Sequence, residues 1–260
     1  MKNSKYLILR RIVQLSLLLL FIGSNVYGWK ILEGNYSTAR VFESFYLSDP
    51  YAVLQMLAAM YMPLSEVIIG ALILFFFYSL FGGRLFCSWV CPINIITDFA
   101  AYLQRKYEIK PLMKTRQVNR KIRYFIMGLG LLLSALFGIA AFELINPITV
   151  LHRALIFGIT FSSSIVVIIF LFDLLILEHG YCGHLCPVGA LYAATGRFRL
   201  LKVYHDKDNC TLCMKCKKVC PEPQVLGLIG KETAKIKTAE CTNCARCIDV
   251  CDDDALKFKL

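Results

Sequence analysis

The stretch Cys210-Thr-Leu-Cys-Met-Lys-Cys-Lys-Lys-Val-Cys-Pro221 follows the pattern C-x2-C-x2-C-x3-C-P, the cysteine run that wraps a cubane iron-sulfur cluster. A second copy of the run begins at Cys241. Three thiolates spaced three positions apart reach three irons of one cube, whereas the fourth cysteine points toward a neighbouring cube. The sequence therefore predicts two 4Fe-4S clusters with crossed ligands. Cluster 1 is predicted to use Cys210, Cys213, Cys216 and Cys251, and cluster 2 to use Cys241, Cys244, Cys247 and Cys220.

Zinc is the main alternative for these cysteines, because C-x2-C pairs also build zinc ribbons. A ribbon uses four thiolates and leaves the remaining cysteines of the two runs without a role. The iron-sulfur interpretation uses all eight. One departure from the pattern is that Asp252, not proline, follows the second run, which weakens the chain turn expected after Cys251 without removing a ligand.

The composition is that of a membrane protein with a soluble end. Hydrophobic residues make up 57% of the 260 residues, and charges gather in blocks between long apolar runs. The net charge of +11 falls beside those runs, which favours membrane-flanking charge over nucleic-acid binding. All twelve cysteines have spacings suited to metal rather than to disulfides, and eight of them require a reducing compartment during cluster assembly.

Four apolar runs of roughly 20 residues match a ~30 Å hydrocarbon layer. The predicted fold class is thus a membrane α-helical bundle of four transmembrane helices with a C-terminal α+β ferredoxin-like domain. The first run follows Lys2, Lys5, Arg10 and Arg11 and fits a retained helix or a signal peptide; we favour the helix. The predicted spans cover residues 12–27, 63–81, 124–142 and 154–177, with a mixed outside loop at 29–62 and a short outside turn at 143–153.

The distribution of basic residues predicts the topology. The segment 82–123 carries nine Lys or Arg, against three in the two loops at 29–62 and 143–153 combined. This asymmetry places segment 82–123, and with it both termini, in the cytoplasm. The domains are accordingly a transmembrane domain at 1–199 and a double-cluster domain at 200–260, which has short strand-like runs around its cysteine loops.

A second cysteine set occurs at the cytoplasmic ends of spans two and four. Cys87 and Cys91, and likewise Cys182 and Cys186, form C-x3-C-P motifs at equivalent places. Four thiolates at two helix ends suffice for a third cluster. Thiols near a helix end and a cation such as Arg84 also suit a redox-active disulfide pair, and buried inert thiols are the third alternative. The repetition favours a metal or redox role, and the species stays open.

Three further polar residues are candidates for proton handling. Asp173 lies inside the fourth span, where an ionisable group is costly and is a functional candidate by default; the alternative is a packing pair with Arg84 or Arg123. His179 and His184 flank Cys182, where they either shuttle protons from a quinol or hydrogen-bond near the headgroups. His205 is predicted to lie on the surface of the soluble domain.

The chain resembles the NapH family, the membrane-bound iron-sulfur quinol dehydrogenase components of periplasmic nitrate reductase systems. The resemblance covers nearly the whole chain. It is carried by stretches 34–37, 84–92, 145–147, 172–175, 178–180, 182–192 and 220–223, among which Arg84-Leu-Phe-Cys-Ser-Trp-Val-Cys-Pro92 and Cys182-Gly-His-Leu-Cys-Pro187 are the most specific. The single cysteine runs are shared by many ferredoxins, whereas the doubled C-x3-C-P motif on a four-span frame is shared only with related membrane polyferredoxins.

The resemblance implies a location in the bacterial inner membrane. It also implies that electrons pass from the membrane quinol pool through this chain to a NapG-like periplasmic iron-sulfur partner, and from there to the nitrate reductase. The predicted topology places clusters 1 and 2 on the opposite side of a ~30 Å layer from that acceptor. Two rival functions remain: an assembly or maintenance factor for a periplasmic reductase, and a docking subunit whose clusters only stabilise a fold.

Overall fold

The computed structural model describes residues 4–113 and 118–260, so Lys2 and part of the basic segment 82–123 lie outside the described residues. The chain forms two compact units. The cysteine-loop unit comprises Met1–Gln14, Phe77–Val90 and Tyr192–Leu260, and the helical unit comprises Leu15–Phe76 and Cys91–Leu191. The cysteine-loop unit therefore takes in two segments from the earlier part of the chain as well as the C-terminal region.

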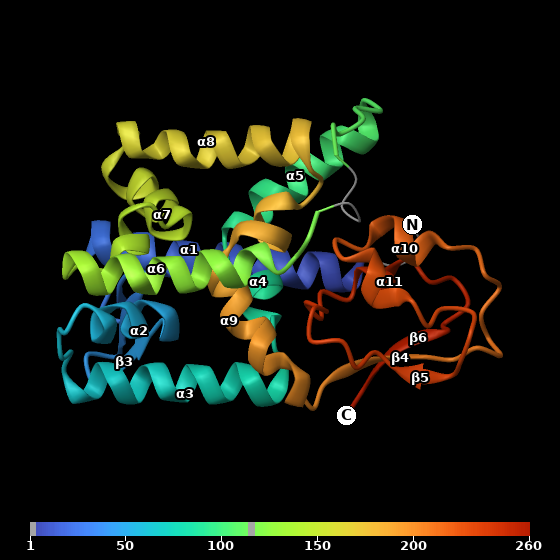
Figure 1. Ribbon diagram of the computed structural model, residues 1–260, viewed down its shortest axis with the longest axis horizontal. Helices are drawn as coiled ribbons and strands as arrows, with labels where there is room; N and C mark the ends of the chain where they lie inside the picture. Colours follow the sequence, from blue (N-terminus) through green and yellow to red (C-terminus); the bar gives the residue numbers. More distant parts are fainter. Residues whose placement is uncertain (1–3, 114–117) are drawn as a thin grey trace. The chain divides into compact units, whose positions relative to one another are not determined.

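Most of the described chain is helical (Figure 1). The α-helices are α1 (Lys5–Tyr27), α2 (Pro50–Ala58), α3 (Ser65–Phe81), α4 (Leu85–Trp89), α5 (Ile93–Lys106), α6 (Ile122–Phe137), α7 (Pro147–Phe157), α8 (Ser164–Leu171), α9 (Pro187–Thr195), α10 (Lys215–Val219) and α11 (Arg246–Asp249). Shorter helical turns are η1 (Ala141–Leu144), η2 (Phe161–Ser163), η3 (Phe172–Ile176), η4 (Tyr181–Leu185), η5 (Gly196–Phe198) and η6 (Pro223–Leu226).

Among the described residues, one helix, α1, has the length and apolar composition needed to cross a bilayer. The segments Ile122–Phe137 and Ala141–Phe157 meet the same criteria only as a pair, and the chain bends by 101° between them. Helix α3 and the segment Phe161–Ile176 are apolar but shorter. Of the four predicted spans, the first is thus a single long helix, and the other three fall in the bent pair and the shorter segments.

The predicted turn at 143–153 and the start of the fourth predicted span are wrong, because α7 occupies this region. The side chain of Asn146 accepts a hydrogen bond from the Ile148 N–H at 3.1 Å, and Pro147 fills the first helical position. After Phe157, Gly158 adopts φ +89° and ends the helix. An N-cap, a proline at the first position and a terminal glycine are sequence signals that favour a helix here.

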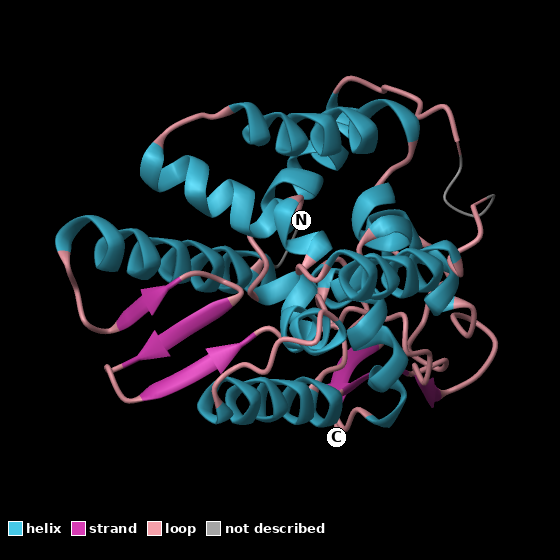
Figure 2. Ribbon diagram, turned by 60° about the vertical axis from the view of Figure 1, so that its left-hand side comes forward, coloured by secondary structure: helices cyan, strands magenta, loops and turns pink. Residues whose placement is uncertain are grey.

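The segment predicted as a mixed loop at 29–62 contains a small sheet and a helix. Strands β1 (Leu32–Gly34), β2 (Thr38–Val41) and β3 (Phe45–Ser48) form an antiparallel sheet in that order (Figure 2). Helix α2 follows directly, capped by the Asp49 side chain, which accepts from the Tyr51 N–H at 3.1 Å. This part of the chain is therefore folded.

Helix α2 packs against α6 within the helical unit. Tyr51 is fully buried, and its hydroxyl donates to the backbone oxygen of Met127 at 3.0 Å. A Cβ at Gly130 would clash with the Tyr51 hydroxyl, so the glycine permits this approach. Gly138 ends α6 in a left-handed conformation, with φ +65°.

The cysteine-loop unit contains a second antiparallel sheet, with strand order β5 (Ala234–Lys235), β4 (Lys202–His205) and β6 (Leu256–Lys259). Helices α10 and α11 lie beside each other next to this sheet (Figure 1). Val203 from β4 and Ile236 form the core together with Leu226, and several cysteines pack against them. So small a core stabilises little by burial alone, which makes bound clusters an expected source of stability.

The first turn of α1 belongs to the same unit. The Asp249 carboxylate, at the end of α11, accepts hydrogen bonds from the backbone N–H groups of Tyr6 and Leu7 at 3.1 and 3.0 Å. The Tyr6 ring also meets the Phe258 ring edge-on, with centroids 5.6 Å apart. The N-terminal end of α1 is thus attached to the cysteine loops.

Candidate metal centres

The two cysteine loops have the same backbone conformation, repeated at an offset of 31 residues from Cys210 to Cys241. Leu212 and its counterpart Asn243 have φ of 59° and 49°, and Met214 and its counterpart Ala245 have φ of 57° and 60°. Such left-handed residues cost about 1–3 kcal/mol each when they are not glycine. Each loop then continues into a short helix, α10 or α11. The shared strain indicates that both loops are shaped for the same task.

Each loop wraps around one cavity, and each cavity receives one cysteine from the other loop. Cavity 1 is lined by the thiols of Cys210, Cys213, Cys216 and Cys251. Cavity 2 is lined by the thiols of Cys220, Cys241, Cys244 and Cys247. These two groups are the crossed ligand sets that the cysteine spacing predicts.

The four thiols of each group surround a space rather than a point. Among residues 4–113 and 118–260, no three Cys, His, Asp or Glu side chains converge closely enough to bind a single metal ion. In a cubane each thiolate binds a different iron, so thiols arranged around a cavity are what a cubane needs. The donor set and its arrangement therefore fit a 4Fe-4S cluster.

Burial shapes the acidity of these thiols. Desolvation raises the pKa of Cys220 and of Cys247 well above the usual value, and neighbouring cysteines add to the effect. Buried thiols in the metal-free protein are therefore held protonated. Metal binding at this unit must release protons, because the thiolate is the ligand.

His205 is buried, so the prediction that it lies on the surface is wrong. Its side chain is 0% exposed and lines cavity 1. Nδ1 lies 2.9 Å from the backbone oxygen of Glu232, and Nε2 is buried without a hydrogen-bond partner in residues 4–113 and 118–260. A buried ring nitrogen that forms no hydrogen bond, next to four thiols, is a second indication that cavity 1 accepts a polar group.

The chain turns after Cys251 without the proline of the first run. Asp253 accepts hydrogen bonds from the backbone N–H and the hydroxyl of Thr211, at 3.3 and 2.6 Å. Asp252 forms an ion pair with Lys215 at 2.6 Å. Both contacts join the end of the second run to the first loop, so acidic side chains hold the turn in place of proline.

The C-x3-C-P cysteines are divided between the two units. Cys87 is in the cysteine-loop unit, where its charge acts on Arg84 and Tyr78. Cys91, Cys182 and Cys186 are in the helical unit. These three act together on one neighbour, Tyr181: burial raises its pKa well above the usual value, and Cys186, Cys182 and Cys91 add to the rise. The structure therefore gathers three of these thiols around Tyr181.

The proton-handling candidates occupy unusual backbone. Asp173 lies in η3 and His184 in η4, both π-helical turns, which are rare and frequent at functional sites. Both side chains are buried, at 0% and 1% exposure. His179 is also buried and has φ +52°. The three candidates thus lie within a short stretch of irregular, buried backbone.

Asp173 is held by backbone rather than by a cation. Its Oδ1 accepts from the Tyr181 N–H at 2.9 Å, and Oδ2 is buried without a hydrogen-bond partner in the described structure. Of the two arginines considered as its partners, Arg84 forms ion pairs with Glu222 and Glu240, and Arg123 donates to the backbone oxygen of Gly183. The alternative of an ion pair between Asp173 and Arg84 or Arg123 therefore does not account for the hydrogen bonding of this carboxylate in the described residues.

Three buried charged residues near cavity 2 were not predicted as site residues. Arg84 and Arg199 are 1% and 0% exposed, and Glu222 lines the cavity at 2% exposure. Glu222 follows Cys220 by two positions and Arg84 precedes Cys87 by three, so their closeness to cysteines was the available signal. Arg199 carried no such signal.

Comparison with known proteins agrees with these sites. The family described as "4Fe-4S dicluster domain" matches residues 202–252, which contain all eight cysteines of cavities 1 and 2. The family described as "4Fe-4S binding domain" matches residues 66–110 and 159–203, each of which contains one C-x3-C-P motif. The ferredoxin-type protein NapH of Haemophilus influenzae is 43% identical over 98% of this chain and 90% of its own length.

The chain belongs to the NapH family of ferredoxin-type proteins. NapH of Escherichia coli is 40% identical over 97% of this chain and 88% of its own length. The methylamine utilization ferredoxin-type protein MauN of Paracoccus denitrificans is 39% identical over 91% of this chain and 84% of its own length. No solved structure matches. The chain is thus a ferredoxin-type iron-sulfur electron-transfer protein of the NapH and MauN type.

Proposed function

We propose that this chain is a membrane electron-transfer protein that oxidises quinol and passes electrons through iron-sulfur centres toward a periplasmic nitrate reductase, by way of a NapG-like partner. The observation that carries the proposal is the pair of cavities, each lined by four thiols from both loops. The acceptor is assigned from the similarity to NapH. The chain supplies electrons and is not itself the nitrate reductase.

The crossed thiols are proposed as the cluster ligands: Cys210, Cys213, Cys216 and Cys251 for cluster 1, and Cys241, Cys244, Cys247 and Cys220 for cluster 2. When bound, a cluster supplies reversible one-electron transfer. Cys241 and Cys247 are buried and keep water away from cavity 2. The exclusion of water would tune the reduction potential of a cluster bound there.

A third centre is proposed at Cys87, Cys91, Cys182 and Cys186. The repeated C-x3-C-P motif supports it, and so does the family match of "4Fe-4S binding domain" to both copies. Cys186 already accepts a hydrogen bond from the Gly189 N–H at 3.4 Å, which is a contact that stabilises a thiolate. A cluster held by these four thiols would supply the one-electron chemistry that quinol oxidation needs.

Quinol oxidation releases two protons, and Asp173, His179 and His184 are proposed to take them. Asp173 is the most specific of the three, because Oδ1 is occupied by the Tyr181 N–H while Oδ2 has no hydrogen-bond partner among the described residues. Oδ2 is therefore the atom that would accept a proton. The two histidines flank Cys182, so the proton acceptors lie next to the proposed third centre in the sequence.

The proposed topology has four membrane spans, a location in the bacterial inner membrane and both termini in the cytoplasm. Three observations support it: the long helix α1, the apolar segments α3 and Phe161–Ile176, and the bent pair that includes α6. The contact of Asp249 with the first turn of α1 places the N-terminal end of that helix beside the cysteine loops. The start of α1 and the loops then face the same side.

The experiment is anaerobic purification in detergent, followed by iron and labile-sulfide counts and mixing with a reduced short-chain quinol. Two clusters give about eight irons per chain, and a third cluster gives about twelve. Quinol is expected to produce the EPR signals of reduced clusters. An iron-free protein, or clusters that only dithionite reduces, would contradict the proposal.

A second candidate function is an assembly or maintenance factor for a periplasmic reductase. The similarity to MauN supports this second candidate, because that relative is named for methylamine utilization and not for nitrate reduction. A maintenance factor would support the stability or maturation of its partner without turning over quinol. Steady-state quinol oxidation coupled to the purified partner separates the two functions.

A further inference from the structure

The segment that carries Cys87 lies directly against the loop that carries two of the cavity 2 cysteines. The Ser88 hydroxyl donates to the backbone oxygen of Thr242 at 2.7 Å, and the Trp89 indole N–H donates to the backbone oxygen of Asn243 at 3.1 Å. In return the Asn243 amide donates to the backbone oxygen of Gly82 at 3.3 Å. All of these residues belong to the cysteine-loop unit. The contact is therefore internal to one folded body.

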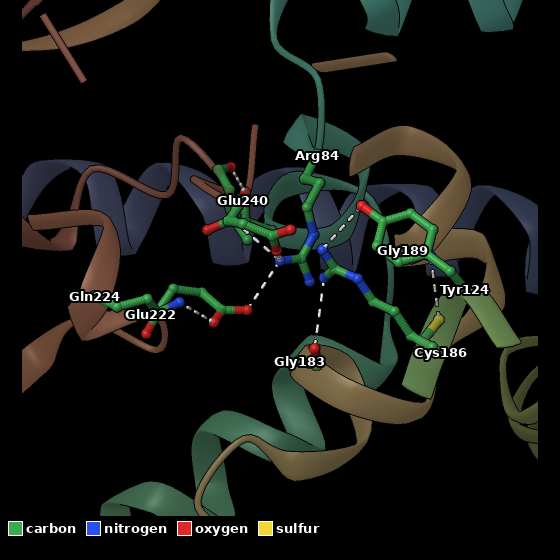
Figure 3. Close-up of polar contacts among 11 residues, drawn as sticks. Arg84, Tyr124, Gly183, Cys186, Gly189, Glu222, Gln224 and Glu240 are labelled. Atoms are coloured by element: carbon green, nitrogen blue, oxygen red, sulfur yellow. Dashed lines mark hydrogen bonds and ion pairs between the residues drawn. The ribbon is translucent and has the colours of Figure 1, made fainter. Parts of the chain in front are cut away.

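Arg84 is the charged residue at this contact. Its side chain is buried, and its Nη1 donates to Glu222 Oε1 at 2.9 Å and to the backbone oxygen of Glu240 at 3.1 Å (Figure 3). The Glu240 carboxylate lies 3.6 Å from the same Nη1. Glu222 lines cavity 2, and Glu240 immediately precedes Cys241. One guanidinium thus reaches both the wall of cavity 2 and the start of its cysteine loop.

Arg84 lies among carboxylates and keeps its charge. Burial opposes a charged Arg84, but Glu222, Cys87 and Glu240 together raise its pKa above the usual value, so it stays cationic. The backbone oxygen of Thr238 accepts from the Cys241 N–H at 3.3 Å. Arg199 is held in place by the backbone oxygens of Gly196, Ile236 and Thr238. Cavity 2 therefore has two buried cations near it.

Cavity 1 has different surroundings. Its lining includes Asp253, and Asp252 is in the same turn, paired with the exposed Lys215. Cys213 is exposed, whereas Cys241, Cys244 and Cys247 are buried. Adding an electron to a cubane adds negative charge, which a buried cation stabilises and a nearby carboxylate does not. Each cavity thus has a carboxylate in its lining, and that of cavity 2, Glu222, is paired with the buried Arg84.

We propose that Arg84 is a positioning residue that raises the potential of cluster 2 by pairing with Glu222 in the wall of its cavity. This inference rests on the proposed function, because it requires that both cavities bind clusters. The effect is electrostatic, and no bond forms or breaks.

The test is a redox titration with chemical mediators, followed by EPR, on the anaerobically purified full chain. Arg84→Gln is expected to lower one of the two ferredoxin midpoint potentials and to leave the other unchanged. Arg84→Lys keeps the charge and is expected to restore most of the shift. Glu222→Gln removes a negative charge from the wall of cavity 2 and is expected to raise the same potential.

Asp253→Asn is the matched control, because it changes one charge at the lining of cavity 1. It is expected to leave unchanged the potential that Arg84→Gln lowers. Equal shifts of both potentials in Arg84→Gln, or no shift in either, would overturn the proposal. If the Arg84→Gln variant loses its clusters, the Glu222→Gln variant provides the test. An unchanged midpoint potential in Glu222→Gln would then overturn the proposal. Mediators replace quinol throughout, so a failure of quinol oxidation does not affect the result.

Discussion

The Asp249 carboxylate caps the first turn of α1 by accepting a hydrogen bond from the backbone N–H of Tyr6 at 3.1 Å. The two residues lie at opposite ends of the chain. A helix start has four N–H groups without partners inside the helix, and a carboxylate there also favours the helix dipole. A residue of the cysteine loops therefore does for α1 what a local N-cap does elsewhere.

Asp249→Ala is expected to weaken the start of α1 by about 1 kcal/mol, the usual cost of losing a cap. The measurement is hydrogen exchange at the amides of Tyr6 and Leu7, which should speed up about fivefold. Asp249→Asn keeps an acceptor and should change exchange little. Asp208→Ala removes an exposed carboxylate of the same unit and serves as the control. Unchanged exchange in Asp249→Ala would show that the cap contributes nothing.

The crossing of ligands predicts which cysteine variants resemble each other. Cys220→Ser and Cys244→Ser are expected to remove the same EPR signal and about four irons each, although they lie in different loops. Cys216→Ser, in the same loop as Cys220, should remove the other signal. If Cys216→Ser and Cys220→Ser instead lost the same signal, the ligands would not cross.

The third centre predicts an effect of the C-x3-C-P cysteines on iron content. Cys87→Ser and Cys182→Ser should each lower the iron count by about four while both ferredoxin signals remain. Quinol-dependent reduction of clusters 1 and 2 should be lost, whereas dithionite should still reduce them. Full iron content together with normal quinol-dependent nitrate reduction in both variants would remove the role proposed for this set.

The pH dependence of stability should include a contribution from Asp49. Burial, with a smaller contribution from Glu143, raises the pKa of Asp49 to about 7. The folded chain therefore binds this proton more tightly than the unfolded chain. Stability should fall as the pH rises from about 4, the usual pKa of an aspartate, to about 7, because folding then opposes deprotonation.

Asp49→Asn separates this effect from the capping role of the residue, because asparagine also caps helices. The variant should flatten the dependence of the thermal midpoint on pH between about 4 and 7, measured in one detergent and salt. A wild-type midpoint that rises with pH across this window, or an unchanged slope in the variant, would contradict the assignment.

The cysteine loops were predictable because their information is local. Spacing determines which thiols reach one cavity, and one of the short strand-like runs predicted around the cysteine loops is found as β4 (Lys202–His205). The sheet of β1 to β3 was missed because its strands have three or four residues and show no clear alternation of burial. His205 was misplaced because nothing in its neighbours in sequence shows that β4 is the central strand.

The charged surroundings of cavity 2 were beyond prediction for a different reason. Arg84 reaches Glu222 across 138 positions of sequence, and Arg199 reaches the backbone oxygen of Thr238 across 39. Neither pairing leaves a periodic or motif signal. Long-range pairs of buried charges become visible only once the fold brings them together.

The exchange of one cysteine between the two loops has a consequence for biogenesis. A cluster in one cavity binds cysteines of both loops and so holds both loops in place. The second cavity is then partly formed before its own iron arrives. Loading should then be cooperative, with half-filled chains scarce at every iron supply. Oxidative damage to one centre would, by the same logic, release both, and the unit would be lost or repaired as a whole.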